Sequence, residues 1–186
     1  GVPIGILTAI FMARFCPKGL YRIMKPAINL MAGIPSVVYG FFGLVILVPL
    51  VRDYIGGRGL SVLTASILLG LMILPTIISM SEAAIRAVPE SYYEGALALG
   101  ASHERSVFSA VVPAAISGIF AGIILGIGRA VGETMAVIMV AGNQTLIPEH
   151  LTDGVRTLTT NIVLEMGYAT DLHREALIAT AVVLFV

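Results

Sequence analysis

The apolar run from residue 119 to residue 140 constrains this chain most, because it is long enough to cross a lipid bilayer. A spanning helix needs roughly 20 apolar residues, and a helix satisfies all of its own backbone polar groups in hydrocarbon. The run nevertheless contains two charged side chains, Arg129 and Glu133. In one continuous helix their four-residue spacing would place both on the same face. Because charges at membrane depth face a protein interior or a water-filled cavity, we expect them to line a substrate path.

The composition indicates a polytopic membrane protein. Only 12% of the 186 residues are charged and 58% are hydrophobic, whereas a soluble domain carries about 25% charged residues. The formal net charge of zero gives no basic signature for nucleic-acid binding. The single cysteine and the scattered histidines have no metal-ligand spacing, so we expect no metal site. The chain also lacks a P-loop, so we expect it not to hydrolyse ATP by that mechanism.

Hydrophobic patterning predicts an all-α bundle of membrane helices. We expect an opening apolar segment at residues 1–13, three full spans, and a last span that begins at Arg174; the full spans are 29–51, 60–80 and 114–142. The two terminal apolar runs are shorter than a bilayer requires. We therefore expect an internal fragment of a longer membrane protein, incomplete at both ends.

Lysine and arginine counts near the membrane predict the orientation. Residues 14–25 hold four basic side chains, and the loop 81–113 adds two. The turn 52–59 and the segment 143–174 hold two each. Since cytoplasmic loops carry the excess of basic residues, we expect 14–25 and 81–113 to face the cytoplasm. The segment 143–173 would then lie outside.

The loop 81–113 carries a specific motif. It contains Glu94, Gly95 and Ala96, then Gly100 after three residues, and then Pro113. A short helix that ends at Gly100 in the left-handed conformation is expected here. The spacing resembles the EAA loop of ABC importer permeases, with Gly95 where the family has alanine. The resemblance implies that this loop, about 81–113, docks on a separate ATPase subunit.

The rest of the chain strengthens this resemblance. Residues 32–43, 74–79 and 128–135 are similar to the phosphate-specific permeases of ABC importers in their PstC-type form. The resemblance implies a type I importer permease fold of roughly six helices, of which 1–186 would be one incomplete transmembrane domain. It implies that Arg129 and Glu133 take part in moving inorganic phosphate by alternating access. The alternatives are a PstA-type partner, a permease for sulfate or molybdate, and an intramembrane enzyme. The enzyme would need a nucleophile–base pair at membrane depth, and no histidine lies in a predicted span.

The resemblance also implies partners. They are a second, different permease, an ABC ATPase dimer that binds ATP and magnesium, and a periplasmic phosphate-binding protein. The location would be the bacterial inner membrane, with no cofactor in this chain. One further pattern concerns Gly118, Gly122 and Gly126, which recur at every fourth position. Small residues at this spacing let helices approach closely, so we expect a seam between two permeases there.

Overall fold

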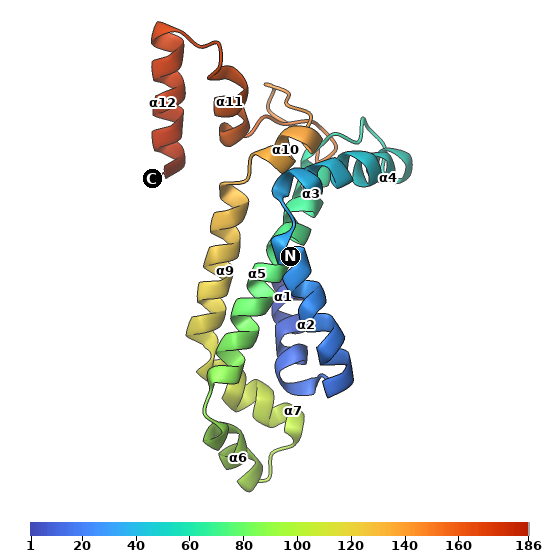
Figure 1. Ribbon diagram of the computed structural model, residues 1–186, viewed down its shortest axis with the longest axis vertical. Helices are drawn as coiled ribbons and strands as arrows, with labels where there is room; N and C mark the ends of the chain where they lie inside the picture. Colours follow the sequence, from blue (N-terminus) through green and yellow to red (C-terminus); the bar gives the residue numbers. More distant parts are fainter. Residues whose placement is uncertain (186) are drawn as a thin grey trace. The chain divides into compact units, whose positions relative to one another are not determined.

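The computed structural model describes residues 1–185 and is dominated by helices (Figure 1). Within these residues there is no strand, and one isolated parallel bridge joins Gly142 to Val155. The helical elements, of which the three labelled η are π-helical turns, are α1 (Val2–Ile10), η1 (Phe11–Phe15), α2 (Lys18–Gly33), α3 (Ser36–Phe42), η2 (Gly43–Leu47), α4 (Val48–Tyr54), α5 (Val62–Ala87), α6 (Glu90–Ala98), α7 (His103–Ser106), η3 (Val107–Val111), α8 (Val112–Ala114), α9 (Ile116–Val131), α10 (Met135–Val140), α11 (Leu158–Glu165) and α12 (Asp171–Phe185).

The chain packs as two compact units. The first unit comprises Gly1–Gly33 and Met72–Ala130. The second comprises Ile34–Leu71 together with the chain from Val131 onward. Helix α5 contributes its first part to the second unit and its remainder to the first.

In the first unit, α9 packs directly against α5 (Figure 1). A Cβ atom added at Gly122 would lie 2.9 Å from the Cβ of Met80, and one added at Gly126 would lie 2.8 Å from Cγ1 of Ile77. A Cβ atom added at Gly118 would likewise collide with the Cβ of Ala84. The predicted glycine seam is therefore a contact within this chain, and the expectation that these glycines join two permeases is wrong.

The second unit is held by equally close contacts between α3, α10 and the start of α5. A Cβ atom at Gly40 would lie 2.8 Å from the Cα of Ala136, so the α3 and α10 backbones nearly touch. Gly43 lies equally close to the side chains of Val140 and Leu68. Helices α11 and α12 lie beside each other in the same unit (Figure 1).

Two described helices are long and apolar enough to cross a membrane, Ser36–Tyr54 and Val62–Ala87. The pair His103–Ala114 and Ile116–Val131, bent by 68°, would make a third span if it counts as one. The expected span 60–80 is confirmed, although the helix continues to Ala87. The expected span 29–51 is misplaced, because α2 continues to Gly33 and a break before Ser36 separates it from the next helix. The break fits Pro35, which lacks a backbone donor and adopts an extended conformation with ψ of 143°.

The expected continuous helix 114–142 is wrong. Helix α9 ends at Val131, α10 begins at Met135, and residues 132–134 are not helical. Gly132 has the low helix propensity that favours an interruption. Apolarity continues across the break, so the hydrophobic pattern alone does not reveal it.

Candidate functional site

Arg129 lies in the last turn of α9 and is half-buried. A cation is favoured there by the partial negative charge of the helix C-terminus. Among residues 1–185 its guanidinium has neither a hydrogen bond nor an ion pair. A half-buried guanidinium without a protein partner is available to bind an anion.

Glu133 lies in the non-helical link and is also half-buried. Its Oε1 accepts a hydrogen bond of 3.0 Å from the backbone N–H of Ala136, in the first turn of α10. Its carbonyl oxygen accepts a 3.2 Å hydrogen bond from Oγ1 of Thr159. The carboxylate thus satisfies an amide that the start of a helix leaves unpaired. Because α9 ends before Glu133, the prediction that Arg129 and Glu133 share one helical face is wrong.

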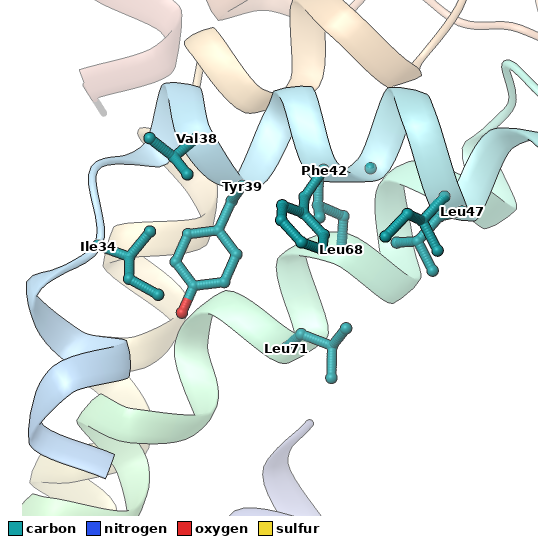
Figure 2. Close-up of a pocket in the computed structure, with 9 residues that line it drawn as sticks. Ile34, Val38, Tyr39, Phe42, Leu47, Leu68 and Leu71 are labelled. Atoms are coloured by element: carbon teal, nitrogen blue, oxygen red, sulfur yellow. The ribbon is translucent and has the colours of Figure 1, made fainter. Parts of the chain in front are cut away.

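An apolar pocket of about 340 Å³ lies in the second unit (Figure 2). Its lining side chains are aliphatic or aromatic, and the Tyr39 hydroxyl is the one polar side-chain group among them. Such a lining offers no charge to an oxyanion. The apolar lining therefore gives no reason to place an anion path in this pocket.

The loop 81–113 contains the predicted short helix, α6. Glu94, Gly95 and Ala96 lie on it, and none of the residues of α6 is buried. The predicted stop is confirmed, since Gly100 has φ of +85°. The amide of Gly100 donates to Leu97 O at 2.8 Å, and the next amide, of Ala101, donates to Ala96 O at 3.1 Å. These two bonds form a Schellman motif, which ends the helix firmly.

Pro113 lies close to a bend in the chain. It lies in α8, two residues before the 68° bend that separates the pair His103–Ala114 and Ile116–Val131. Leu99, at the end of α6, is 92% exposed. Tyr92 and Leu97 of α6 are exposed as well, so this helix presents several apolar side chains to its surroundings.

Three contacts hold α6 and the neighbouring His103 against the rest of the first unit. Arg14 NH1 and Glu90 Oε2 form an ion pair of 3.0 Å, which joins η1 to the first turn of α6. The Tyr93 hydroxyl lies 2.7 Å from Nδ1 of His103, and the His103 ring packs edge-on against Phe15 with centroids 4.8 Å apart. Arg14 and Phe15 come from more than 70 residues away in the chain, so the pattern of the loop gave no signal for their contacts.

A buried carboxylate in the first unit was also missed. The Glu82 side chain, on α5, is 2% exposed and lies 2.6 Å from Lys25 Nζ. Its Oε1 accepts hydrogen bonds from the Tyr21 hydroxyl at 2.7 Å and from Arg86 Nε at 2.8 Å. Arg86 NH2 in turn donates to Met12 O at 2.9 Å. The four-residue spacing of Glu82 and Arg86 was the one sequence signal for this network.

Comparisons with known proteins give one consistent result. The model of the family "Binding-protein-dependent transport system inner membrane component" matches residues 1–186. A probable ABC transporter permease, YqgH of Bacillus subtilis, is 44% identical over 169 residues, which cover 90% of this chain and 55% of that protein. The phosphate transport system permease PstC of Xylella fastidiosa is 36% identical over 206 residues, covering 100% of this chain and 63% of the relative.

A more distant relative agrees. The probable phosphate transport system permease PstC of Methanocaldococcus jannaschii is 32% identical over 207 residues, covering 100% of this chain and 64% of that protein. The chain thus spans between 55% and 64% of the length of these three relatives.

Proposed function

This chain belongs to the family of binding-protein-dependent transport system inner membrane components, and we propose that it is the PstC-type permease part of an ATP-driven importer for inorganic phosphate. The predicted all-α, type I importer fold is in keeping with this membership. Support for phosphate comes from the names of relatives such as the Xylella and Methanocaldococcus permeases. Since the chain covers about 64% of their length at most, the activity of the whole protein is part of the proposal.

Arg129 carries the proposal. It is a half-buried cation at the end of an apolar helix, and no described side chain neutralises it. Its planar fork can donate two hydrogen bonds to one tetrahedral oxyanion at once. Phosphate passing through the permease during alternating access would supply the negatively charged partner that the Arg129 guanidinium lacks among the described residues.

Glu133 has a second role in this proposal. Its Oε1 holds the start of α10, so it shapes the link that follows Arg129 in the chain. An ionised carboxylate can also accept a hydrogen bond from HPO₄²⁻, whereas sulfate has no proton to donate. Glu133 would thereby disfavour sulfate and weaken the binding of phosphate, which suits a path that must release its substrate.

The coupling role falls to the loop 81–113. We assign Glu94, Gly95, Ala96, Gly100 and Pro113 to docking on a separate ABC ATPase, which would bind ATP and magnesium. The exposure of α6 and its firm stop support this assignment. A second permease and a periplasmic phosphate-binding protein would complete the importer.

The family of the chain and its long apolar helices identify it as a multi-pass membrane protein. We place it in the bacterial inner membrane, as one transmembrane permease domain over residues 1–186. Residues 14–25 and 81–113 would face the cytoplasm, and 143–173 the periplasm. Cysteine labelling of whole cells at Ser102 and Thr152, in a Cys16→Ala background, tests this topology. An impermeant reagent should label position 152 alone, and labelling at 102 alone would reverse the assignment.

Uptake of labelled phosphate by the full-length importer in proteoliposomes tests the central claim. Arg129→Gln should reduce uptake at least about a hundredfold, because two charge-assisted hydrogen bonds are lost. Arg129→Lys should retain part of it. Arg174→Gln, an exposed position without an ion pair among residues 1–185, is the matched control and should transport normally.

Competition with excess sulfate or molybdate shows which oxyanion the importer transports. Unlabelled phosphate should compete with the labelled substrate, and the other oxyanions should not. Normal uptake by Arg129→Gln would show that the path lies elsewhere. Transport of sulfate or molybdate in preference to phosphate would replace the proposed substrate.

A further inference from the structure

A basic pocket of about 640 Å³ lies in the first unit, between η1, α2 and α5. Five of its ten lining residues are cationic and none is acidic. The five cations are Arg14, Lys18, Arg22, Lys25 and Arg86. Three separate elements of the chain thus bring positive charge to one concave surface.

The surrounding carboxylates do not neutralise this pocket. Glu82 pairs with Lys25 and Arg86, and Glu90 pairs with Arg14. Two negative charges against five positive charges leave an excess of three. The remaining two cations, Lys18 and Arg22, have no ion pair or hydrogen-bonded partner for their side chains within residues 1–185.

Lys18 and Arg22 also repel each other. They are four residues apart on α2, so their side chains are neighbours on one face. Like charges at this spacing destabilise a helix, and a bound anion would remove the penalty. Both side chains belong to exposed residues and are free to reach a ligand.

Arg14 gives an independent sign of a missing acceptor. Its side chain is 13% exposed, and NH1 is engaged by Glu90. Its Nε is buried and has no hydrogen-bond partner. A buried donor without an acceptor is costly, and such groups are rare in native structures. Because Nε is shielded from solvent, an oxyanion in the pocket would satisfy it only after the Arg14 side chain changes rotamer.

We propose that this pocket binds a phosphate-group anion, as free inorganic phosphate or as the headgroup of an anionic lipid. Guanidinium groups match the oxygens of a phosphate group, and lysines add charge. Helix α2 also carries exposed apolar side chains, Leu20 and Ile23, which at about 100° per residue lie on the face opposite the basic residues. This mixture of basic and apolar groups is typical of helices at a membrane surface.

The pocket is separate from the Arg129 site. Gly118 of α9 is level with Ala84 of α5, which lies between Glu82 and Arg86 in the same helix. Arg129 lies eleven residues further along α9, which is roughly 16 Å at 1.5 Å per residue. The inference therefore does not depend on the proposed transport path.

The test uses the full-length importer without its binding protein, in an Arg129→Gln background that removes the transport-path site. One arm measures equilibrium binding of labelled inorganic phosphate in nanodiscs of phosphatidylcholine. The other arm measures how much phosphatidylglycerol the detergent-purified complex retains from a mixture with phosphatidylcholine, by native mass spectrometry. The test variant is Lys18→Gln/Arg22→Gln, and the control Arg58→Gln/Arg174→Gln removes two exposed, unpaired charges elsewhere.

We expect the test variant to lose at least about tenfold in affinity in one arm or in both, while the control changes less than about twofold. Loss in the phosphate arm identifies free phosphate as a ligand, and loss in the lipid arm identifies an anionic headgroup. Binding equal to the control in both arms would overturn the proposal. The single variant Arg22→Gln should give an intermediate loss, which keeps the test decisive if the double variant assembles poorly.

Discussion

Replacing Glu82 by glutamine should destabilise the subunit markedly. The Glu82 side chain is 2% exposed, and it is the shared partner of Lys25 and Arg86. Breaking a fully buried ion pair costs about 3–5 kcal/mol, because an uncompensated charge stays behind. Here the cations can regain water, since the Lys25 and Arg86 side chains are 31% and 46% exposed. We therefore expect about 2 kcal/mol.

The loss should appear in the unfolding of the full-length subunit in mixed micelles, followed by circular dichroism at increasing dodecyl sulfate. In a thermal melt, about 2 kcal/mol corresponds to roughly 3 °C for a full-length subunit of about 300 residues. Glu90→Gln is the matched control. It removes the same kind of group from an ion pair with Arg14, but the Glu90 side chain is 57% exposed. That loss should stay below about 1 kcal/mol.

A double-mutant cycle isolates the interaction. Lys25→Gln alone should cost less than Glu82→Gln, because Arg86 and Tyr21 still bind the carboxylate. The double variant should be more stable than the sum of the single effects predicts, by at least about 0.5 kcal/mol. If Glu82→Gln and Glu90→Gln destabilise the subunit equally, burial does not govern the strength of this network and the reasoning fails.

Three further predictions follow from single contacts. Gly100→Val should uncouple ATP hydrolysis from phosphate uptake in the reconstituted importer, because a β-branched residue is strained at φ of +85°. Gly95 lies inside helix α6, so Gly95→Ala should leave coupling intact. If Gly100→Val also couples normally, Gly100 takes no part in coupling. The pKa of the Tyr21 phenol is raised above 10.0, mainly because its O–H donates to the Glu82 carboxylate. The stability from that bond is present below pH 10 and is lost as pH rises through the folded pKa, so Tyr21 should ionise late in an ultraviolet titration and earlier in Glu82→Gln. Gly122→Leu should lower the melting temperature sharply and Gly128→Leu should not, because an added Cβ meets Met80 at 2.9 Å in the first case and nothing within 4 Å in the second; equal melting temperatures would contradict the packing.

Local features were predictable from the sequence. The end of α6 at Gly100 could be predicted, because a single residue in the left-handed conformation ends a helix through local hydrogen bonds. The span 60–80 could also be predicted, because an apolar run of that length is typical of a membrane-spanning helix. Its extension to Ala87 could not, since the added turns carry Glu82 and Arg86 and look like a polar loop. Glu82 is buried there because it binds Lys25 and Tyr21, which lie more than 50 residues away in the chain.

Arg129 and Glu133 remain a prediction as site residues, and the structure corrects the geometry that was expected for them. Arg129 and Glu133 stand out because charges are rare in apolar runs. The spacing argument then assumed one helix, and the assumption failed at residues 132–134. A carboxylate that caps Ala136 competes with helix continuation, and this competition is decided by backbone hydrogen bonds that hydropathy does not record.

The contacts of the first unit connect helix α6 to α9, which carries Arg129, through side chains of η1 and α5. Glu90 of α6 holds Arg14 of η1, and Arg86 of α5 holds the η1 backbone at Met12. Helix α5 then lies against the glycine face of α9, whose last turn carries Arg129. Such tight helix contacts leave little room for sliding, so α5 and α9 should move together. If α6 docks on an ATPase as proposed, a displacement of α6 would therefore be transmitted to Arg129 through side-chain contacts of the first unit.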